Sequence, residues 1–447
     1  MEGLEISVVK LSEVLEDVDL RLESEYYNSE HIVFNSVQGC DIESFSQYGT
    51  SEDLNEEGKG FPILRLNEFD SFFISKPSKY CDLISKETFE LLKLKKNDVL
   101  ICRTNGNPKY VGKAAIVPKN YEYAFASYVF RLRPKTDIIN SATLVSFLNS
   151  KYGRIEIEKY SMVGNQANFS PAKFRQIAIP ILSKELNNKI EEIVYKSFEL
   201  LEESKSLYSQ AEDLLLGELG LKDWQPKNTL HTTKKFSDFA QSGRLDAEYY
   251  QPKYDEIEKA IKSYKGGYDI VSNLFNQNLD VCDYKKTEYN YIEIGDVNVG
   301  DGSVSFNKVE TSELPDNAKR VLNKNDILIS KVRPYRGAVA IIDFEQEDLI
   351  GSGAFTVLQE KSSYKKETLQ ILFRTAVYKD WLLKWNVGSS YPVIKDEDIL
   401  NLSIPILPEQ IQTKIASLIQ QSFECKAQSK QLLEDAKRMV EEEIEKN

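Results

Sequence analysis

The feature that most constrains the fold of this 447-residue chain is an internal duplication, in which segments of the first half recur in the second half at a nearly constant offset. Four short segments recur in the same order, at 21–27 and 244–250, 96–101 and 324–329, 179–182 and 404–407, and 197–199 and 422–424. Chance could supply one such match, but four in the same order indicate two copies of one structural unit. A chain of this length is also too long for one ordinary core, so two to four folding units are expected.

The first part of each copy is predicted to consist of strands and turns. Short β-branched and aromatic runs alternate there with Gly, Asn, Asp and Pro, which is typical of a β-rich domain. The clearest expected strands lie at 99–102, 114–117, 327–330 and 338–342. Short helices are expected at 142–151 and, in the second copy, at 367–384.

Each copy then changes to the period of a long helix, with apolar and small residues at alternating steps of four and three, the pattern of a coiled-coil seam. The first expected seam consists of Leu186, Ile190, Ile193, Ser197, Leu200, Ser204, Leu207, Ala211 and Leu214. The second lies at the corresponding positions of the other copy and consists of Ile411, Ile415, Leu418, Ser422, Cys425, Ser429, Leu432, Ala436 and Met439. Proline precedes both stretches and interrupts neither, so each can form one continuous helix.

Two seams of matching length in one chain most simply pack on each other. An antiparallel register with Leu200 opposite Cys425 places small residues against small ones near the middle. This register pairs Ser197 with Ser429 and Ser204 with Ser422. The alternative is that each helix packs only on its own globular domain.

The expected fold class is therefore α+β, with two tandem β-rich domains, each followed by a long helix, and with the two helices packed as an antiparallel coiled coil. The expected boundaries are 1–184 for the first β-rich domain, 185–220 for the first helix, 221–408 for the second domain and 409–447 for the second helix.

The charge of the chain is unevenly distributed. A net charge of −13 argues against binding to DNA, whose phosphates attract Lys and Arg. Residues 61–184, however, contain 20 basic and 10 acidic residues, which is a net charge of +10. Residues 225–408 contain 24 basic and 27 acidic residues, so nucleic-acid binding by the second copy would depend on a local patch.

Residues suited to catalysis are scarce. The two histidines, His31 and His231, lie in polar stretches and are expected at the surface. The five cysteines never form Cys-x-x-Cys, which favours neither disulfides nor a zinc site. A Gly-rich phosphate loop and the Asn/Asp-Pro-Pro-aromatic motif of amino-methyltransferases are both missing from the sequence. We therefore expect no catalytic residue and no metal site in this chain.

The sequence shows no export or membrane signal. The first residues lack the basic and apolar regions of a signal peptide, and no apolar run is long enough to span a bilayer. With scattered cysteines, this composition predicts a soluble protein of a reducing cytoplasm.

Two loops in each copy carry residues suited to binding. The loops that follow the strands at 99–102 and 327–330 offer cations, tyrosines and glycines, and Arg, Asn and Lys are the residues that contact bases and phosphates. The candidates there are Arg103, Asn105, Lys109, Tyr110, Lys113, Lys331, Arg333, Tyr335 and Arg336. A solvated hairpin tip would have the same composition, so both interpretations remain open.

A second pair of loops precedes the repeated Ile-Pro-Ile-Leu segments and is rich in amides and hydroxyls. Its candidates are Asn165, Gln166, Asn168, Ser389, Ser390 and Tyr391. These side chains could reach base edges, or they could cap and position the segment that follows. The repeated tyrosine pairs at 26–27 and 249–250 are expected in core packing rather than in stacking on DNA.

Together these elements resemble the specificity (S) subunits of type I restriction-modification systems, over essentially the whole chain. The motifs that carry the resemblance are the repeated Arg-Leu-acidic segment ending in Tyr-Tyr, the Lys-Asn-Asp turn at 96 and 324, Gly-Asn-Gln at 164–166, and Pro-Glu-Gln at 408–410. The first copy departs from the pattern, because Ser183-Lys184-Glu185 stands where Pro-Glu-Gln is expected, which blurs the start of its helix.

The resemblance implies a non-catalytic subunit that works in phage defence. Two target recognition domains, related by pseudo-twofold symmetry, would each read one half of a bipartite, asymmetric site in double-stranded DNA. The helices would set the spacing and bind two adenine methyltransferase (M) subunits, and restriction/translocase (R) subunits would join for cleavage. S-adenosylmethionine, ATP and Mg would belong to those partners, in a bacterial or archaeal cytoplasm.

The helices also suggest a spacing. The 28 steps from Leu186 to Leu214 correspond to roughly 42 Å at about 1.5 Å per residue, or about 12 base pairs. Two other classes of function remain possible. The chain could be a protein-binding scaffold that does not bind DNA, which its acidity favours, or an enzyme with an unrecognised site.

Overall fold

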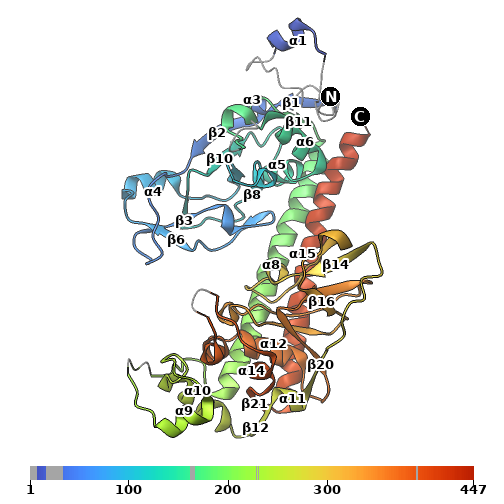
Figure 1. Cartoon of the computed structure of the whole chain (residues 1–447). Coiled ribbons are helices and arrows are strands. Elements are labelled where there is room, and N and C mark those ends of the chain that lie inside the picture. The colour runs from blue at the N-terminus through green and yellow to red at the C-terminus, as the bar shows by residue number, and fades with distance from the viewer. Residues whose placement is uncertain are drawn as a thin grey trace. The chain divides into compact units, whose positions relative to one another are not determined.

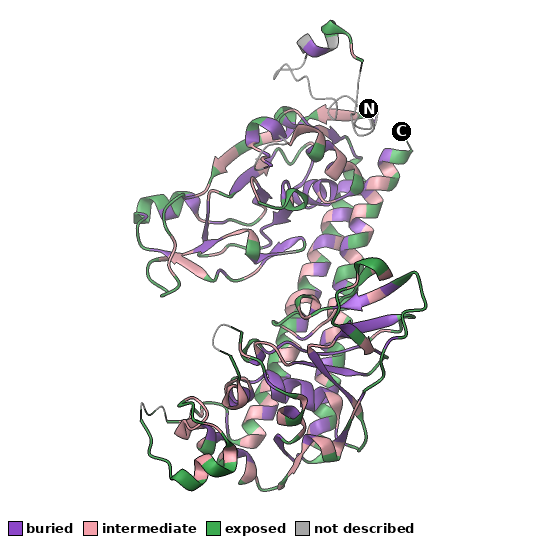
Figure 2. Ribbon diagram, in the orientation of Figure 1, coloured by how far each residue is buried: buried purple, intermediate pink, exposed green. Residues whose placement is uncertain are grey.

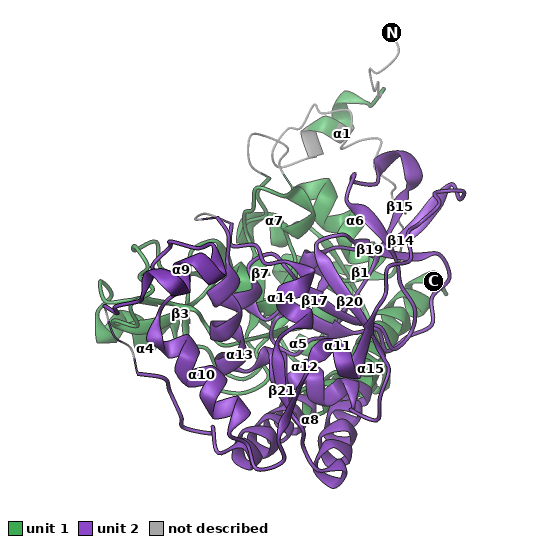
Figure 3. Cartoon of the chain, turned by 60° about the horizontal axis from the view of Figure 1, so that its bottom comes forward, with its two compact units in different colours: residues 1–201, 426–447 green, residues 202–425 purple. Residues whose placement is uncertain are grey.

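The computed structural model describes residues 8–16, 34–161, 167–227, 229, 231–388 and 391–446. The chain divides into two compact units (Figure 3). Unit 1 consists of residues 1–201 and 426–447, and unit 2 consists of residues 202–425. Each unit therefore contains one β-rich region and a part of both long helices.

Among the described residues, unit 1 contains four small sheets with the strand orders β1-β11, β2-β10-β7-β8, β6-β3-β9 and β4-β5. Figure 1 labels several of these strands. Its strands are β1 (Ser36–Gln38), β2 (Glu43–Tyr48), β3 (Phe61–Leu64), β4 (Phe69–Asp70), β5 (Phe73–Ile74), β6 (Lys79–Cys81), β7 (Val99–Cys102), β8 (Ala114–Ile116), β9 (Ala124–Phe125), β10 (Val129–Pro134) and β11 (Ala178–Pro180). Its shorter helices are α1 (Leu11–Glu16), α3 (Gly39–Ile42), η1 (Leu66–Glu68), α4 (Lys86–Leu92), η2 (Pro108–Tyr110), α5 (Ser141–Leu148), α6 (Lys151–Tyr160) and α7 (Pro171–Phe174).

In the part of unit 2 that the structure describes there are three sheets, with the orders β12-β21, β13-β20-β17-β18 and β15-β14-β19-β16. Its strands are β12 (Tyr268–Ile270), β13 (Phe275–Gln277), β14 (Glu288–Ile292), β15 (Asn307–Glu310), β16 (Ala318–Val321), β17 (Ile327–Ser330), β18 (Val339–Ile341), β19 (Leu349–Ser352), β20 (Phe355–Glu360) and β21 (Ser403–Pro405). Its shorter helices are α9 (Phe236–Ser242), α10 (Pro252–Lys262), α11 (Val271–Leu274), η3 (Ile294–Asp296), η4 (Thr311–Glu313), η5 (Pro334–Arg336), α12 (Lys366–Arg374), α13 (Ala376–Trp381), η6 (Leu382–Trp385) and α14 (Asp396–Leu400).

The duplication seen in the sequence recurs in the topology. The four-stranded sheets of the two units place equivalent strands in the same order, and β7 and β17 lie inside them as fully buried strands. In both units a parallel pair, β3 with β9 and β14 with β19, belongs to a second sheet. The mixture of helices and sheets confirms the α+β class.

The turn before each buried strand explains why Lys-Asn-Asp is repeated. Asn97 and Asn325 both have a left-handed backbone, with φ of 70° and 74°, and Asn is one of the few residues that adopt this conformation readily. The carboxylates of the following Asp98 and Asp326 each accept a hydrogen bond from a backbone N–H three residues earlier, at 2.9 and 3.0 Å. One conformation is therefore built twice from the same residues.

The short helices differ from the prediction in one respect. The stretch expected as a single helix at 142–151 ends where a second helix begins, which gives the pair α5 and α6, and the stretch expected at 367–384 is divided into the pair α12 and α13, followed by η6. Ser150 and Thr375, which occupy equivalent positions in the two copies, cap the second helix of each pair by accepting the N–H of Gly153 and Tyr378. Side-chain capping competes with continuation of the preceding helix, and a prediction from apolar runs does not register it.

The long helices are α8 (Lys184–Leu219) and α15 (Glu409–Glu445), with 36 and 37 residues. They begin at equivalent positions of the two copies even though the first copy lacks Pro-Glu-Gln. Ser183 takes over the start of α8, because its hydroxyl accepts the N–H of Leu186 at 3.1 Å.

Segments of the two long helices pack together inside each unit. In unit 1 the Ser197 hydroxyl lies 2.8 Å from the Ser429 hydroxyl and donates to the Ser429 carbonyl at 3.0 Å. In unit 2 the Ser422 hydroxyl lies 3.0 Å from the Ser204 hydroxyl and donates to the Ser204 carbonyl at 2.8 Å. These are the two serine pairs that the sequence predicted.

The apolar positions of the seam are less regular than predicted. Ile190, Leu200, Ala211, Ile415 and Ala436 are buried, as are the four serines. Leu186, Ile193, Leu207, Leu214, Ile411, Leu418, Cys425, Leu432 and Met439 are only half-buried. Several residues outside the predicted seam are buried instead, among them Val194, Leu215, Ile419, Leu433, Val440 and Ile444.

The reason for this difference is that the helix segments also cover the β-rich regions. Val194 and Val440 belong to the core around β7 and α5 in unit 1, and Leu215 and Ile419 belong to the core around β17 and α12 in unit 2. Figure 2 shows buried residues on the strands and along the long helices. A helix that faces both a partner helix and a sheet buries more than one seam. In the part of the chain that the structure describes, no helix is long and apolar enough to cross a membrane.

Candidate nucleic-acid interface

The loops after β7 and β17 are held by the same set of backbone hydrogen bonds, which we call the loop frame. Arg103 and its equivalent Lys331 donate their N–H groups to Tyr128 and Ala354, both at 2.8 Å. Their carbonyls accept N–H groups from the second loop of the same unit: Phe169 donates to Arg103 at 2.7 Å and Ile394 donates to Lys331 at 3.0 Å. An isolated β-bridge then joins the next residue of the first loop to the second loop, Thr104 to Asn168 in unit 1 and Val332 to Val393 in unit 2.

In each unit, therefore, the structure brings together the two loops that the sequence selected as binding segments. Asn168 and Tyr391 lie in the described parts of the second loops. Asn165, Gln166, Ser389 and Ser390 lie outside the described residues, as do the first copy of the Arg-Leu-acidic motif at 21–27 and His31. His231 is exposed.

In unit 1 the candidate residues divide into anchored and exposed ones. The half-buried Arg103 lies over the Tyr48 ring, with its guanidinium carbon 4.9 Å from the ring centroid, and donates to the Ser127 carbonyl at 3.4 Å. The Asn105 side chain accepts the N–H of Asn107 at 2.8 Å and so shapes the turn itself.

The exposed part of this loop is its tip. Lys109 and Tyr110 are exposed, and the Lys113 ammonium lies 5.7 Å from the Tyr110 ring centroid. Lys109 and Tyr110 can contact phosphate or a base from this tip, and the half-buried Lys113 lies beside them against the Tyr110 ring.

In unit 2 the first candidate, Lys331, forms an ion pair within the protein. The Lys331 ammonium lies 3.0 Å from the Asp396 carboxylate, and the Lys331 side chain is 16% exposed. Thr356 donates to the other Asp396 oxygen at 2.7 Å. Lys331 therefore links the first loop to the start of α14, which is a structural role.

The other three candidates in the first loop of unit 2 are accessible from solvent. Arg333 is half-buried with its guanidinium carbon 4.4 Å from the centroid of the Tyr391 ring, while Tyr335 and Arg336 are exposed. Tyr391 itself is 63% exposed. The two loops of unit 2 thus present two cations and two aromatic rings to solvent.

Sequence reasoning missed several residues that hold these loops. Tyr48 supports Arg103 from β2, Asp396 holds Lys331, and Arg154 on α6 donates to the Val111 carbonyl at 2.8 Å. Burial lowers the pKa of Arg154. Tyr48, Asp396 and Arg154 lie far along the chain from the loops they support, so no local pattern indicates them.

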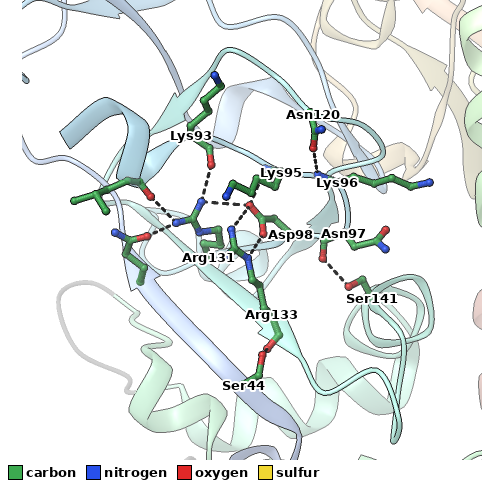
Figure 4. Close-up of polar contacts among 12 residues, drawn as sticks. Ser44, Lys93, Lys95, Lys96, Asn97, Asp98, Asn120, Arg131, Arg133 and Ser141 are labelled. Carbon is green, nitrogen blue, oxygen red and sulfur yellow. Dashed lines mark hydrogen bonds and ion pairs between the residues drawn. The ribbon is translucent and has the colours of Figure 1, made fainter. Parts of the chain in front are cut away.

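Some of the basic residues in 61–184 pair with a buried carboxylate of unit 1 and do not stand free at the surface (Figure 4). Asp98 is 1% exposed and pairs with Arg131 at 3.3 Å and with Arg133 at 2.5 Å. Arg131 is 2% exposed and also donates to the Lys93 and Leu91 carbonyls, both at 2.8 Å. Burial lowers the pKa of Arg131. The buried Arg131 therefore stabilises the sheet and does not add to the binding surface, whereas Arg133 pairs with Asp98 and is 35% exposed.

The repeated Arg-Leu-acidic motif forms a clamp in unit 2. Arg244 pairs with Asp246 at 2.7 and 2.8 Å and donates to the carbonyls of Trp385 and Asn386 at 3.1 and 2.7 Å. Tyr249 lies under the guanidinium at 4.9 Å. The tyrosine pair at 249–250 is half-buried around this arginine, so the core position expected for it is only partly reached. The clamp holds the chain immediately before the second loop.

Among the described residues, no group of three or more His, Cys, Asp or Glu side chains is arranged to hold a metal ion. The site consists of loops with cations, amides, hydroxyls and aromatic rings.

Comparison with known proteins identifies one copy of the duplicated unit. Residues 269–438 match the family model described as the type I restriction modification DNA specificity domain. The matched residues lie in the second copy, and the resemblance found in the sequence is confirmed. No curated protein matches the sequence.

Similar solved structures come from the same systems. The S subunit of a type I restriction-modification system from M. genitalium is 13% identical with a TM-score of 0.43, over 93% of this chain and 96% of that chain. The HsdS subunit from Thermoanaerobacter tengcongensis is 12% identical with a TM-score of 0.29, over 92% and 96%. At these identities and scores the two likenesses carry no functional argument for this chain.

Proposed function

We propose that this chain is the DNA-recognition subunit of a type I restriction-modification complex and that it has no catalytic activity of its own. The observation that carries the proposal is the duplicated loop frame. Two equivalent sites, each made of two loops from one unit, present donors and rings, and one of them lies within the matched specificity domain.

In this proposal the regions 1–184 and 221–408 are target recognition domains. Each reads one half of a bipartite, asymmetric site in double-stranded DNA. The helices at 185–220 and 409–447 pair along their length as an antiparallel coiled coil and keep the two readers at a set distance. The serine pairs Ser197–Ser429 and Ser204–Ser422 support this pairing, since each is built within one unit in the predicted register.

The same proposal assigns the chemistry to partners. Two adenine methyltransferase subunits bind this chain and supply S-adenosylmethionine, and restriction/translocase subunits supply ATP and Mg chemistry, in the cytoplasm of a cell defending itself against phage. The chain offers these partners sequence recognition and a docking surface on its helices.

The test uses the full chain co-expressed with its methyltransferase partner. We expect binding to duplex DNA that weakens steeply with salt, because phosphate contacts release counterions, and methylated adenines within one bipartite motif in the host genome. The complex without this chain is the control. Absence of a methylated motif together with salt-independent binding would contradict the proposal and favour the scaffold alternative.

The spacer function has its own test. Inserting seven residues into both long helices preserves the seam and lengthens the rods by about 10 Å, so the gap between half-sites should grow by about 3 base pairs. Both half-site sequences should stay unchanged in the methylation map. An unchanged gap would contradict the role of the helices as a ruler.

A further inference from the structure

Arg333 is the first residue of its loop to leave the frame that the two units share. One position earlier, Thr104 and Val332 are both bridged to the second loop. At the next position unit 1 has Asn105, whose side chain is used in a local turn, whereas unit 2 has Arg333. The loops of the two units therefore begin to differ at this position, as expected for two domains that read different DNA sequences.

The backbone of Arg333 is held in an unusual conformation. Its φ and ψ are 48° and 54°, in the left-handed region that disfavours residues with a Cβ atom. The following Pro334 restricts it further. The fold imposes this conformation, because the N–H of Arg333 donates to the Pro392 carbonyl at 2.7 Å and Val332 is bridged to Val393. Strained backbone of this kind is concentrated at functional sites.

The side chain of Arg333 is packed against an aromatic ring but has no ion-pair partner among the described residues. Its guanidinium carbon lies over the Tyr391 ring, 4.4 Å from the ring centroid, which places the group against the aromatic face. Among the described residues no carboxylate lies within ion-pair distance of it, and the Asp396 carboxylate is paired with Lys331. Arg103 of unit 1, in contrast, donates to the Ser127 carbonyl.

A stacked guanidinium with open donors matches one base edge in particular. Guanine presents two acceptors, O6 and N7, in the major groove, and arginine spans them with two parallel N–H groups. Lysine offers a point charge and cannot reproduce this planar fork.

We propose that Arg333 reads a guanine in the half-site bound by unit 2 and that Tyr391 is the positioning residue that holds its plane. This inference rests on the proposed function. It names the base and the side chain through which unit 2 obtains part of its specificity.

The test measures binding of the full chain, in complex with its methyltransferase partner, to duplexes in which each base pair of the site is replaced in turn. For Arg333→Ala we expect the preference for one G·C pair in one half-site to fall by about 5- to 150-fold, while the preferences at all other positions persist. Arg333→Lys should not restore it. Tyr391→Phe should keep the preference and Tyr391→Ala should weaken it at that same position.

Two variants separate this effect from misfolding and from general loss of charge. Arg333→Gly removes the side chain and relieves the left-handed backbone, so it should fold and still lose the same base preference. Arg336→Ala removes a nearby exposed cation and should weaken binding to all sequences alike, with a shallower salt dependence.

The outcomes distinguish the inference from the proposed function. If the unmodified complex shows no sequence preference, the proposed function fails. If it is specific and Arg333→Ala and Arg333→Gly keep every base preference, or lose all of them equally, the inference alone is overturned.

Discussion

The recognition loops of the two units begin alike and end differently. Up to Thr104 and Val332 they share the same hydrogen bonds and the same bridge to the second loop. Beyond that point unit 1 forms a turn around Asn105, and unit 2 presents Arg333 against Tyr391. The two copies therefore share the backbone contacts that hold the loops and differ in the residues at the loop tips, as the proposed recognition of two different half-sites requires.

The same contrast appears beneath the loops. The repeated turn carboxylate is Asp98 in one unit and Asp326 in the other. In unit 1 it is neutralised by Arg131 and Arg133. In unit 2 it accepts only neutral donors besides the backbone, namely Gln359 at 2.9 Å and Asn278 at 3.1 Å. Unit 1 thus contains a buried ion cluster where unit 2 has an amide network.

The largest expected effect tests this difference directly. Asp98→Ala should lower the free energy of unfolding of unit 1 by about 3–5 kcal/mol, because Arg131 would stay buried without its counter-charge. Asp326→Ala should cost unit 2 only about 1–3 kcal/mol, because neutral donors lose one acceptor. Urea unfolding of the full chain measures both; equal losses would break the comparison.

A smaller effect is expected at the clamp of unit 2. Arg244→Ala should cost about 1.5–3 kcal/mol, since it removes charge-assisted hydrogen bonds to the Trp385 and Asn386 carbonyls. Hydrogen exchange at the amide of Val387, which donates to Val393, should accelerate. The affinity for DNA should fall only through lost contacts to the half-site that unit 2 is proposed to bind. Unchanged exchange at Val387 would show that the clamp does not hold the second loop.

The pH dependence of the two turns should also differ. Burial, followed by the charge of Asp280, raises the pKa of Asp326. The folded state therefore binds a proton more readily than the unfolded state, and this contribution to stability is fully present below the ordinary Asp pKa and lost as pH rises through the raised one. Asp326→Asn removes this dependence, so its stability relative to the unmodified chain should fall as pH is lowered from 7. A difference that does not change with pH would contradict the raised pKa.

The smallest effects are expected in the helices. Ser197→Ala should cost unit 1 about 1 kcal/mol, and Ser422→Ala, at the equivalent position, should cost unit 2 the same. The double variants Ser197→Ala with Ser429→Ala and Ser204→Ala with Ser422→Ala should be nearly neutral, because no buried hydroxyl is left without a partner. Thermal unfolding checks this; clearly unequal single costs would show that the two helix pairings are not equivalent.

Local patterns in the sequence predicted the repeated elements well. The strands β7 and β17, the turns at Asn97 and Asn325, the long helices and the serine pairs all follow from residues that are close in sequence or repeated at one offset. The broken helices were missed because Ser150 and Thr375 act through single capping bonds. Val194 and Leu215 are buried although they lie outside the predicted seam, because the helices also pack against the sheets. A pattern that considers only two helices does not predict this packing.

The candidate site was predicted less completely. The sequence selected two loops in each copy but did not predict that they meet, and it counted Lys331 among the binding residues, whereas the structure pairs Lys331 with Asp396. It missed Tyr48 and Arg154, which support the unit 1 loop from distant elements. Which cation is anchored and which is open depends on partners far along the chain, and those partners are set only by tertiary structure.

The most direct test of two independent readers in one chain is a methylation map with variants of one unit at a time. In cells carrying the complete complex, the account predicts methylation within one bipartite motif. Arg333→Gly should change the sequence of one half of this motif. The double variant Lys109→Ala with Lys113→Ala should weaken recognition of the other half. A single contiguous motif, or changes in both halves from a variant in one unit, would contradict it.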